Sequence, residues 1–287
     1  METVWHILWH SLLDSLKLLP FLFLTYLLME LLEHKAGERI ERAITRGGRV
    51  GPFVGGVLGL LPQCGFSTAA AGLFAGRVVT VGTLLAVFLS TSDEMLAIFI
   101  GAAMPARIIF TVLGIKLAVA VLFGFLADLL FAKWGQIGQV SDLCEREGCH
   151  CEQGVWRSAL RHTVKIFLFV LLVNLLLGAV LELVGAERLA AAMNGVPVLG
   201  VAASALVGLI PNCAASVAVA SLYTKGLISA GAMLAGLLTG AGAGLLVLFR
   251  TNRRLRDNLA FALALFLIGA LVGTLIDLTG LGAWLGL

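Results

Sequence analysis

The chain has 287 residues, of which 60% are hydrophobic and 13% are charged, whereas a soluble domain carries about 25% charged residues. The net charge of +3 is small, and the basic residues stand in short segments between apolar runs. This composition excludes an ordinary soluble enzyme and gives no reason to expect a nucleic-acid partner. It predicts an integral membrane protein whose first partner is the lipid bilayer.

The apolar runs of the first half predict spanning helices, because about 18 or more apolar residues suit a membrane helix and β-barrel alternation is absent. In chain order we expect a first span, a polar stretch, an apolar block and a long span, at 11–33, 34–49, 52–104 and 107–131. The apolar block is broken twice, at LPQC (61–64) and at STSDE (90–94). The expected fold class is therefore an all-α polytopic membrane protein with broken helices or re-entrant hairpins.

The second half repeats this plan after a hydrophilic loop. A span, a broken block and a basic turn are expected at 163–184, 196–249 and 250–256, followed by a last span that ends near 278. We accordingly divide the chain into a first transmembrane repeat, a hydrophilic Cys/His loop and a second transmembrane repeat, at 1–132, 133–161 and 162–287.

An internal repeat supports this division. The segment GLLPQCGFS (59–67) recurs as GLIPNCAAS (208–216), with Cys64 and Cys213 separated by 149 residues, and 12 of 37 positions are identical between 59–95 and 208–244. The same offset pairs Asp128 with Asp277 and Gly82 with Gly231. Two halves derived from one unit explain this pattern.

The distribution of basic residues predicts the topology. Segments 35–49, 133–165 and 250–256 hold 14 of the 20 Lys and Arg residues, so all three should face the cytoplasm. Five spans in each half satisfy all three placements, and four do not. We therefore expect about ten helices as two inverted five-helix repeats, with the central loop cytoplasmic and both termini outside.

The two Pro-containing breaks are the first candidate substrate site. Proline frees backbone carbonyls, which in a membrane must be satisfied by protein or line a watery cavity. Inverted repeats with interrupted helices are typical of secondary transporters. The polar residues at these breaks are Gln63, Cys64, Ser67, Asn212, Cys213 and Ser216. The alternative is that small polar residues and cysteine only serve helix packing.

The second break of the first half adds two carboxylates, Asp93 and Glu94, preceded by three hydroxyl side chains, Ser90, Thr91 and Ser92. Acids inside a membrane are costly and mark ion ligands or proton carriers, although a place in the headgroup region is the competing interpretation. The equivalent stretch of the second half, TGAGAG (239–244), has no acid. Any role that depends on a carboxylate at this break is therefore confined to the first half of the chain.

Other ionisable residues are candidates for proton coupling or structure. His10 and Asp14 share a face of the first span, and His162 begins the equivalent helix. They are expected either to relay protons or to form an interfacial polar cap. Asp128 and Asp277 are expected to be structural, and Lys116 should either pair with one of these acids or extend to the interface.

The hydrophilic loop contains a compact group of soft ligands, namely Cys144, Cys149, His150 and Cys151. Three thiols and an imidazole this close can close on one metal ion, and a disulfide is the competing interpretation. Because a cytoplasmic loop keeps thiols reduced, metal binding is favoured. No resident cofactor is expected, and neither a Walker loop nor a catalytic triad is present, so the chain is not expected to be an enzyme.

Several motifs together resemble a known family. They are PQCGFS (62–67), FLSTSDEM (88–95), CHCEQG (149–154), GLIPNCAAS (208–216) and GLLTGAGAGLLVLFR (236–250). In these motifs, and over nearly the whole chain, the sequence resembles the ten-helix heavy-metal exporter family, whose members are labelled manganese transporters or arsenic-efflux-like permeases. The resemblance implies a transporter of the prokaryotic inner membrane. It carries over to the break residues named above, with His150 and His162 as accessories.

The leading hypothesis is a secondary transporter that exports a divalent transition metal, with protons as counter-ions. Cys64, Cys213 and Asp93 would be metal ligands, together with amides and unwound carbonyls. Because Mn²⁺ prefers oxygen ligands, two thiols also leave open a softer metal, an arsenical or another small anionic or organic solute. A metal sensor that signals through the Cys/His loop is the alternative of another class. Whether the protein forms a homo-oligomer stays open.

Overall fold

The computed structural model describes residues 50–61, 64–76, 78–92, 95–131, 197–252, 254–282 and 287, with isolated positions within 16–27 and 156–175. All regular structure in these ranges is helical, which confirms the expected all-α class for this part of the chain. The expected first span (11–33) and the expected span at 163–184 lie largely outside the described residues.

The described helices form two sets of five, and each set is interrupted where the sequence predicted breaks. The first set is α3 (Gly51–Gly59), α4 (Cys64–Ala75), α5 (Val81–Ser90), α6 (Met95–Gly101) and α7 (Ala106–Leu130). The second set is α11 (Pro197–Gly208), α12 (Cys213–Thr224), α13 (Ala230–Thr239), α14 (Ala243–Thr251) and α15 (Leu255–Thr279).

Four segments of the described chain are long and apolar enough to cross a membrane: Val81–Gly101, Ala106–Leu130, Ala230–Thr251 and Leu255–Thr279. On α15, leucines recur at every fourth position from Leu255 to Leu275, and each is about half exposed. A continuous exposed leucine stripe on a long helix is suited to lipid rather than to water. The molecule is therefore a multi-pass membrane protein.

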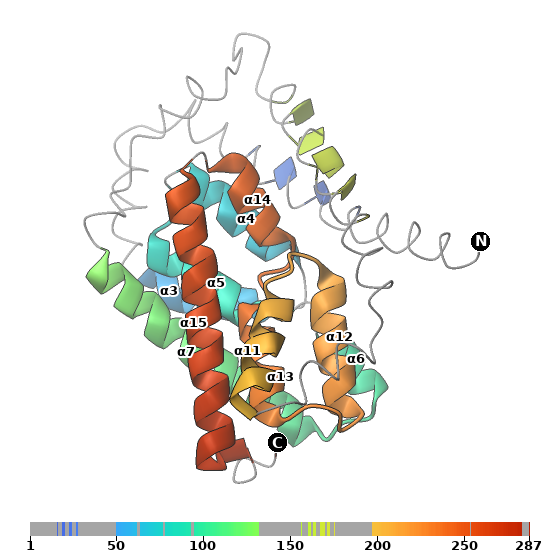
Figure 1. Ribbon diagram of the computed structural model, residues 1–287. Helices are drawn as coiled ribbons and strands as arrows, with labels where there is room; N and C mark the ends of the chain where they lie inside the picture. The colour runs from blue at the N-terminus through green and yellow to red at the C-terminus, as the bar shows by residue number, and fades with distance from the viewer. Residues whose placement is uncertain are drawn as a thin grey trace, which may run out of the picture.

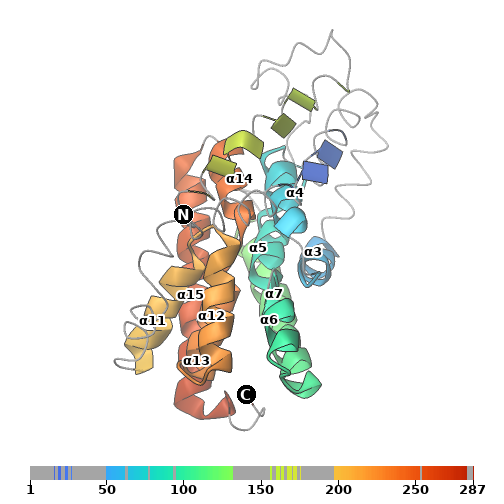
Figure 2. The same cartoon turned by 90° about the vertical axis from the view of Figure 1, so that its right-hand side faces the viewer.

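Each set of helices builds the same three-helix group. In the first half α5 packs against both α3 and α7, and in the second half α13 packs against both α11 and α15; the two outer helices also touch each other in each half. Helices α5 and α13 also contact each other, which joins the two three-helix groups at the centre of the molecule (Figure 1, Figure 2).

The start of each central helix is held by an aspartate from the long helix beside it. Asp128 accepts hydrogen bonds from the Thr80 hydroxyl (2.8 Å) and the Gly82 amide (2.7 Å) at the beginning of α5. At the beginning of α13, Asp277 accepts from the Ser229 hydroxyl (2.6 Å) and the Gly231 amide (2.8 Å). These carboxylates bond two donors at a helix N-terminus, where negative charge is favourable. The expectation that they are structural agrees with this geometry.

Glycine permits the same close helix contact in both halves. A methyl group added at Gly82 would collide with the carbonyl oxygen of Gly124, and one added at Gly231 would collide with that of Gly273. Small residues at such points let helix backbones approach closely in a membrane, where packing rather than water exclusion holds helices together.

The remaining short helices pack against helices of the other half. Helix α4 of the first half packs against α14 of the second, and α12 of the second half packs against α6 of the first. Since α4 is equivalent to α12 and α6 to α14 under the 149-residue offset, the two contacts are the same contact with the halves exchanged.

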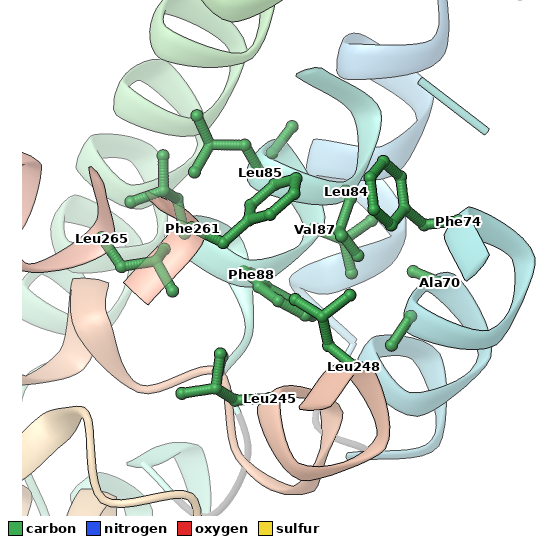
Figure 3. Close-up of a cluster of buried hydrophobic side chains, with 14 of the residues drawn as sticks. Ala70, Phe74, Leu84, Leu85, Val87, Phe88, Leu245, Leu248, Phe261 and Leu265 are labelled. Atoms are coloured by element: carbon green, nitrogen blue, oxygen red, sulfur yellow. The ribbon is translucent and has the colours of Figure 1, made fainter. Parts of the chain in front are cut away.

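Two hydrophobic clusters lie on either side of the helix breaks. One joins α4 and α5 to α14 and α15, with Phe74 edge-on to Phe261 (centroids 5.1 Å apart) and Phe88 fully buried (Figure 3). The other joins α6 and α7 to α11, α12 and α13, and includes the fully buried Met95 and Phe99. The interrupted spans α5–α6 and α13–α14 each contribute one part to each cluster, so their breaks fall between the two clusters.

Candidate functional site

The four helix breaks are neighbours in space. A methyl group at Gly59, the last residue of α3, would meet the hydroxyl of Ser90, the last residue of α5. The equivalent Gly208 lies against Thr239 in the same way. Across the halves, a methyl group at Gly244 would lie 2.7 Å from the Ser67 Cβ. The breaks that the sequence separates are therefore gathered in one region between the two hydrophobic clusters.

In the second half, the break IPNC is organised by Asn212. Its side-chain oxygen accepts a hydrogen bond from the Ala214 amide (2.8 Å) and caps the start of α12. The Ser216 hydroxyl donates to the Cys213 carbonyl (2.8 Å), and both side chains are buried. The predicted site residues Asn212, Cys213 and Ser216 thus lie together in the first turn of α12, where the helix dipole is positive.

The equivalent break of the first half is described in part. Cys64 is the first residue of α4, Ser67 is fully buried beside α14, and the Thr68 hydroxyl donates to the Gly65 carbonyl (2.8 Å). Ser67 lies in the first turn of α4, and Gly244 lies in the first turn of α14. The N-terminal ends of two helices from different halves therefore approach each other at this contact.

Three buried hydroxyl groups close the C-terminal end of α5. Ser90 donates to the Ala86 carbonyl (2.9 Å), Thr91 to the Val87 carbonyl (2.7 Å) and Ser92 to the Ser90 carbonyl (2.9 Å). Each hydroxyl thus uses its proton on a carbonyl near the end of its own helix. Because a hydroxyl oxygen keeps two lone pairs, these oxygens are suited to contribute ligands for a cation.

Lys116 is the site residue that sequence reasoning placed wrongly. Its side chain is fully buried in the middle of α7, and its ammonium donates to the carbonyl oxygens of Thr91 (2.5 Å) and Leu237 (2.7 Å). It neither extends to the interface nor pairs with Asp128 or Asp277, whose carboxylates bond the starts of α5 and α13. The sequence feature that could have indicated this buried position is a lysine in the middle of an apolar span, in a chain with two broken spans.

Ten of the predicted site residues lie outside the part of the chain that the structure describes. They are Gln63, Asp93, Glu94, His10, Asp14, His162, Cys144, Cys149, His150 and Cys151. Within the described ranges, no three His, Cys, Asp or Glu side chains come close enough to hold a metal ion. The described part of the site therefore consists of hydroxyl groups, an amide, a thiol, carbonyl oxygens and one ammonium group.

Comparison with known proteins identifies the class. Residues 5–188 match a family described as "Putative, 10TM heavy-metal exporter". That range contains the first half, the Cys/His loop and the expected span at 163–184, so the match ends before IPNC (210–213). No curated protein and no solved structure matches the chain. Since the family match covers well over half of the chain, the protein belongs to this family.

Proposed function

We propose that this protein is a secondary transporter that exports a divalent transition metal by alternating access, and that its substrate site lies where the helix breaks meet. The observation that carries the proposal is the contact between breaks of different halves. Ser67 of α4 packs on Gly244 of α14, and Lys116 bonds to the ends of both interrupted spans. A site at the junction of two repeats, built from broken helices, is the arrangement that secondary transporters use.

The proposal includes two inverted five-helix halves. It is supported by the reciprocal contacts α4–α14 and α12–α6, which exchange under the repeat offset as a two-fold relation requires. It is supported independently by the basic segments, which fall on one side of the membrane only when each half crosses five times. Rocking of one half against the other about the breaks would then expose the site alternately to each side.

The ligands we assign come from both halves. Gln63, Asn212 and the hydroxyl oxygens of Ser90 to Ser92 would bind through oxygen, and Cys64 and Cys213 through sulfur. Asp93 would contribute the charge that a divalent cation needs, with Glu94 exchanging protons. A hard metal such as Mn²⁺ would use mainly the oxygen ligands, whereas a softer metal would also use the thiols.

A second candidate is a permease for an arsenical or another small anionic solute. The observation that favours it is electrostatic, because the described part of the site holds a buried ammonium group and the positive ends of α4 and α14. Such an arrangement attracts an anion unless the negative charges of Asp93 and Glu94, which follow Ser92 in the chain, outweigh it. The two candidates thus differ in the sign of the charge at the site.

Uptake into everted membrane vesicles tests both candidates. Vesicles with and without the protein are given Mn²⁺, Zn²⁺, Cd²⁺, arsenite or arsenate, each with and without an imposed pH gradient. We expect uptake of a divalent cation that increases with the gradient. Uptake of an arsenic species without any cation would replace the first candidate by the second, and no uptake of any of them would refute the transporter itself.

Deletion of the Cys/His loop separates transport from sensing. If the protein transports, removing residues 144–151 leaves most of the vesicle uptake intact, and replacing Cys64 or Cys213 lowers it. If it acts as a sensor, the deletion abolishes the response of the cell to metal while Cys64 and Cys213 are dispensable.

A further inference from the structure

Lys116 places a positive charge at the C-terminal ends of two helices. One bond goes to Thr91, which directly follows α5, and the other to Leu237, which is two residues before the end of α13. The last carbonyls of a helix have no partner within the helix and form the negative end of its dipole. Two such ends, one from each half, therefore converge on the same ammonium group.

The repeat shows that this lysine is an addition to a shared framework. Under the 149-residue offset Lys116 corresponds to Leu265, Thr91 to Gly240 and Leu237 to Phe88. Leu265 is fully buried too, but it packs in the hydrophobic cluster with Phe88 (Figure 3). The two halves thus place a buried side chain at the same point, and only the first half supplies a cation there.

We propose that the carbonyl oxygens of Thr91 and Leu237 form a monovalent-cation site, which Lys116 fills permanently with a cation attached to the chain. Carbonyl oxygens bind alkali cations by replacing their hydration shell, and the C-terminal ends of broken helices coordinate such ions in transporters. If the ammonium group is removed, both carbonyls lose a charged donor inside the protein. A free Na⁺ or K⁺ ion then takes its place, because buried carbonyls without a donor are costly.

The test is the thermal stability of the purified full-length Lys116→Met variant. Methionine has a similar length and no charge, so it leaves the carbonyl pair empty without a large cavity. Unfolding is followed in 150 mM NaCl, KCl or N-methyl-D-glucamine chloride, which on the Debye scale of about 8 Å screen exposed charges equally. Leu265→Met is the matched control at the equivalent position of the other half.

We expect the midpoint of unfolding of Lys116→Met to be at least about 2 °C higher in Na⁺ or K⁺ than in N-methyl-D-glucamine, since an ion that binds only the folded state stabilises it. Wild type and Leu265→Met should unfold at the same temperature in all three salts. If Lys116→Met shows no difference between the salts, or yields no folded protein in any of them, the carbonyls do not form a cation site.

The outcome does not depend on the transported solute. The measurement uses stability alone, so it can fail while metal uptake by wild-type vesicles succeeds, and the reverse holds as well. If the proposal is right, wild-type transport is also unaffected when Na⁺ and K⁺ in the vesicle assay are replaced by N-methyl-D-glucamine.

Discussion

Residues 80–128 and residues 229–277 make the same framework contacts and yet differ at the breaks they carry. In both, an aspartate of the long helix bonds the hydroxyl and the amide at the start of the central helix, with donor–acceptor distances of 2.6–2.8 Å. In both, a glycine pair brings the same two helices together. The framework has therefore been kept in both copies.

The breaks themselves have diverged. After α5 the first half has Ser92, Asp93 and Glu94, where the second half has Ala241, Gly242 and Ala243 after α13. The first half also has Lys116 where the second has Leu265. At these positions, Asp, Glu and Lys therefore occur only in the first half, whereas the second half has small or apolar residues.

The crossing contacts differ in the same way. Gly244 lets α14 approach α4 so closely that a methyl group there would meet the Ser67 backbone at 2.8 Å. The equivalent position in α6 is the fully buried Met95, and α6 packs less extensively against α12 than α14 does against α4. The α4–α14 contact is therefore the closer one. We expect a substitution at this contact to destabilise the protein more than a substitution at the equivalent α12–α6 contact.

The largest effect is expected from removing charge at the first-half break. Asp93→Asn should reduce vesicle uptake of a divalent metal by at least about 100-fold, because even indirect partners of a metal ligand are typically worth about 10–100-fold in affinity. The control in the other half is Ala241→Ser at the position equivalent to Ser92, which adds a hydroxyl without charge and should leave uptake within a factor of about three. Equal uptake by Asp93→Asn and wild type would show that the site does not use this carboxylate.

A large effect on stability is expected at the closer crossing contact. Gly244→Val should destabilise the protein by at least about 3 kcal/mol, because the added atoms collide with the Ser67 backbone, which cannot move away as a side chain could. Met95→Val, the same residue at the equivalent position, should cost only about 1 kcal/mol. Denaturant unfolding in detergent measures both. Similar losses for the two variants would contradict the difference between the two contacts.

A moderate effect is expected at the helix starts. Asp128→Asn and Asp277→Asn each replace a carboxylate that accepts two hydrogen bonds by an amide that can accept fewer, and bonds to charged groups are worth about 1.5–3 kcal/mol. Thr80 is partly buried and Ser229 is exposed, so the Asp128 change should be the more costly. Unfolding temperatures decide the order. If Asp277→Asn lowers the unfolding temperature more than Asp128→Asn does, the burial of the hydrogen-bonded hydroxyl does not determine the cost.

The smallest effect is expected from replacing glycines of α7 by alanine. Gly114 has open space where a side chain would stand, whereas a methyl group at Gly124 would lie 2.8 Å from the Gly82 carbonyl oxygen. Gly114→Ala should therefore stabilise the protein by about 0.5–1 kcal/mol through helix propensity. Gly124→Ala should destabilise it. If both variants are stabilised, the contact between α5 and α7 is looser than the geometry indicates.

Much of the fold could be predicted from local patterns. The span expected at 107–131 corresponds to α7 (Ala106–Leu130), and the span expected to end near 278 corresponds to α15, which ends at Thr279. The breaks expected at LPQC and STSDE separate α3 from α4 and α5 from α6. Apolar length and Pro placement determine these features within the segment itself, so no tertiary information is needed.

The contacts across the molecule could not be predicted in this way. Nothing in the residues near Ser67 indicates that it packs on Gly244, because that contact depends on how the two halves cross. Lys116 shows the same point, since its partners Thr91 and Leu237 are 25 and 121 residues away in the chain. Sequence spacing predicts neighbours along one helix, whereas these contacts depend on the packing of several helices.

The sequence by itself thus determined a helical membrane protein of two related halves with paired breaks, because hydropathy, proline and repetition act along the chain. Only the tertiary structure decided that the breaks of different halves lie together and that a buried lysine joins the ends of two of them. The physical reason is that a charge inside a membrane protein must find partners, and two of the partners of Lys116 are backbone carbonyls, which the residue letters do not reveal.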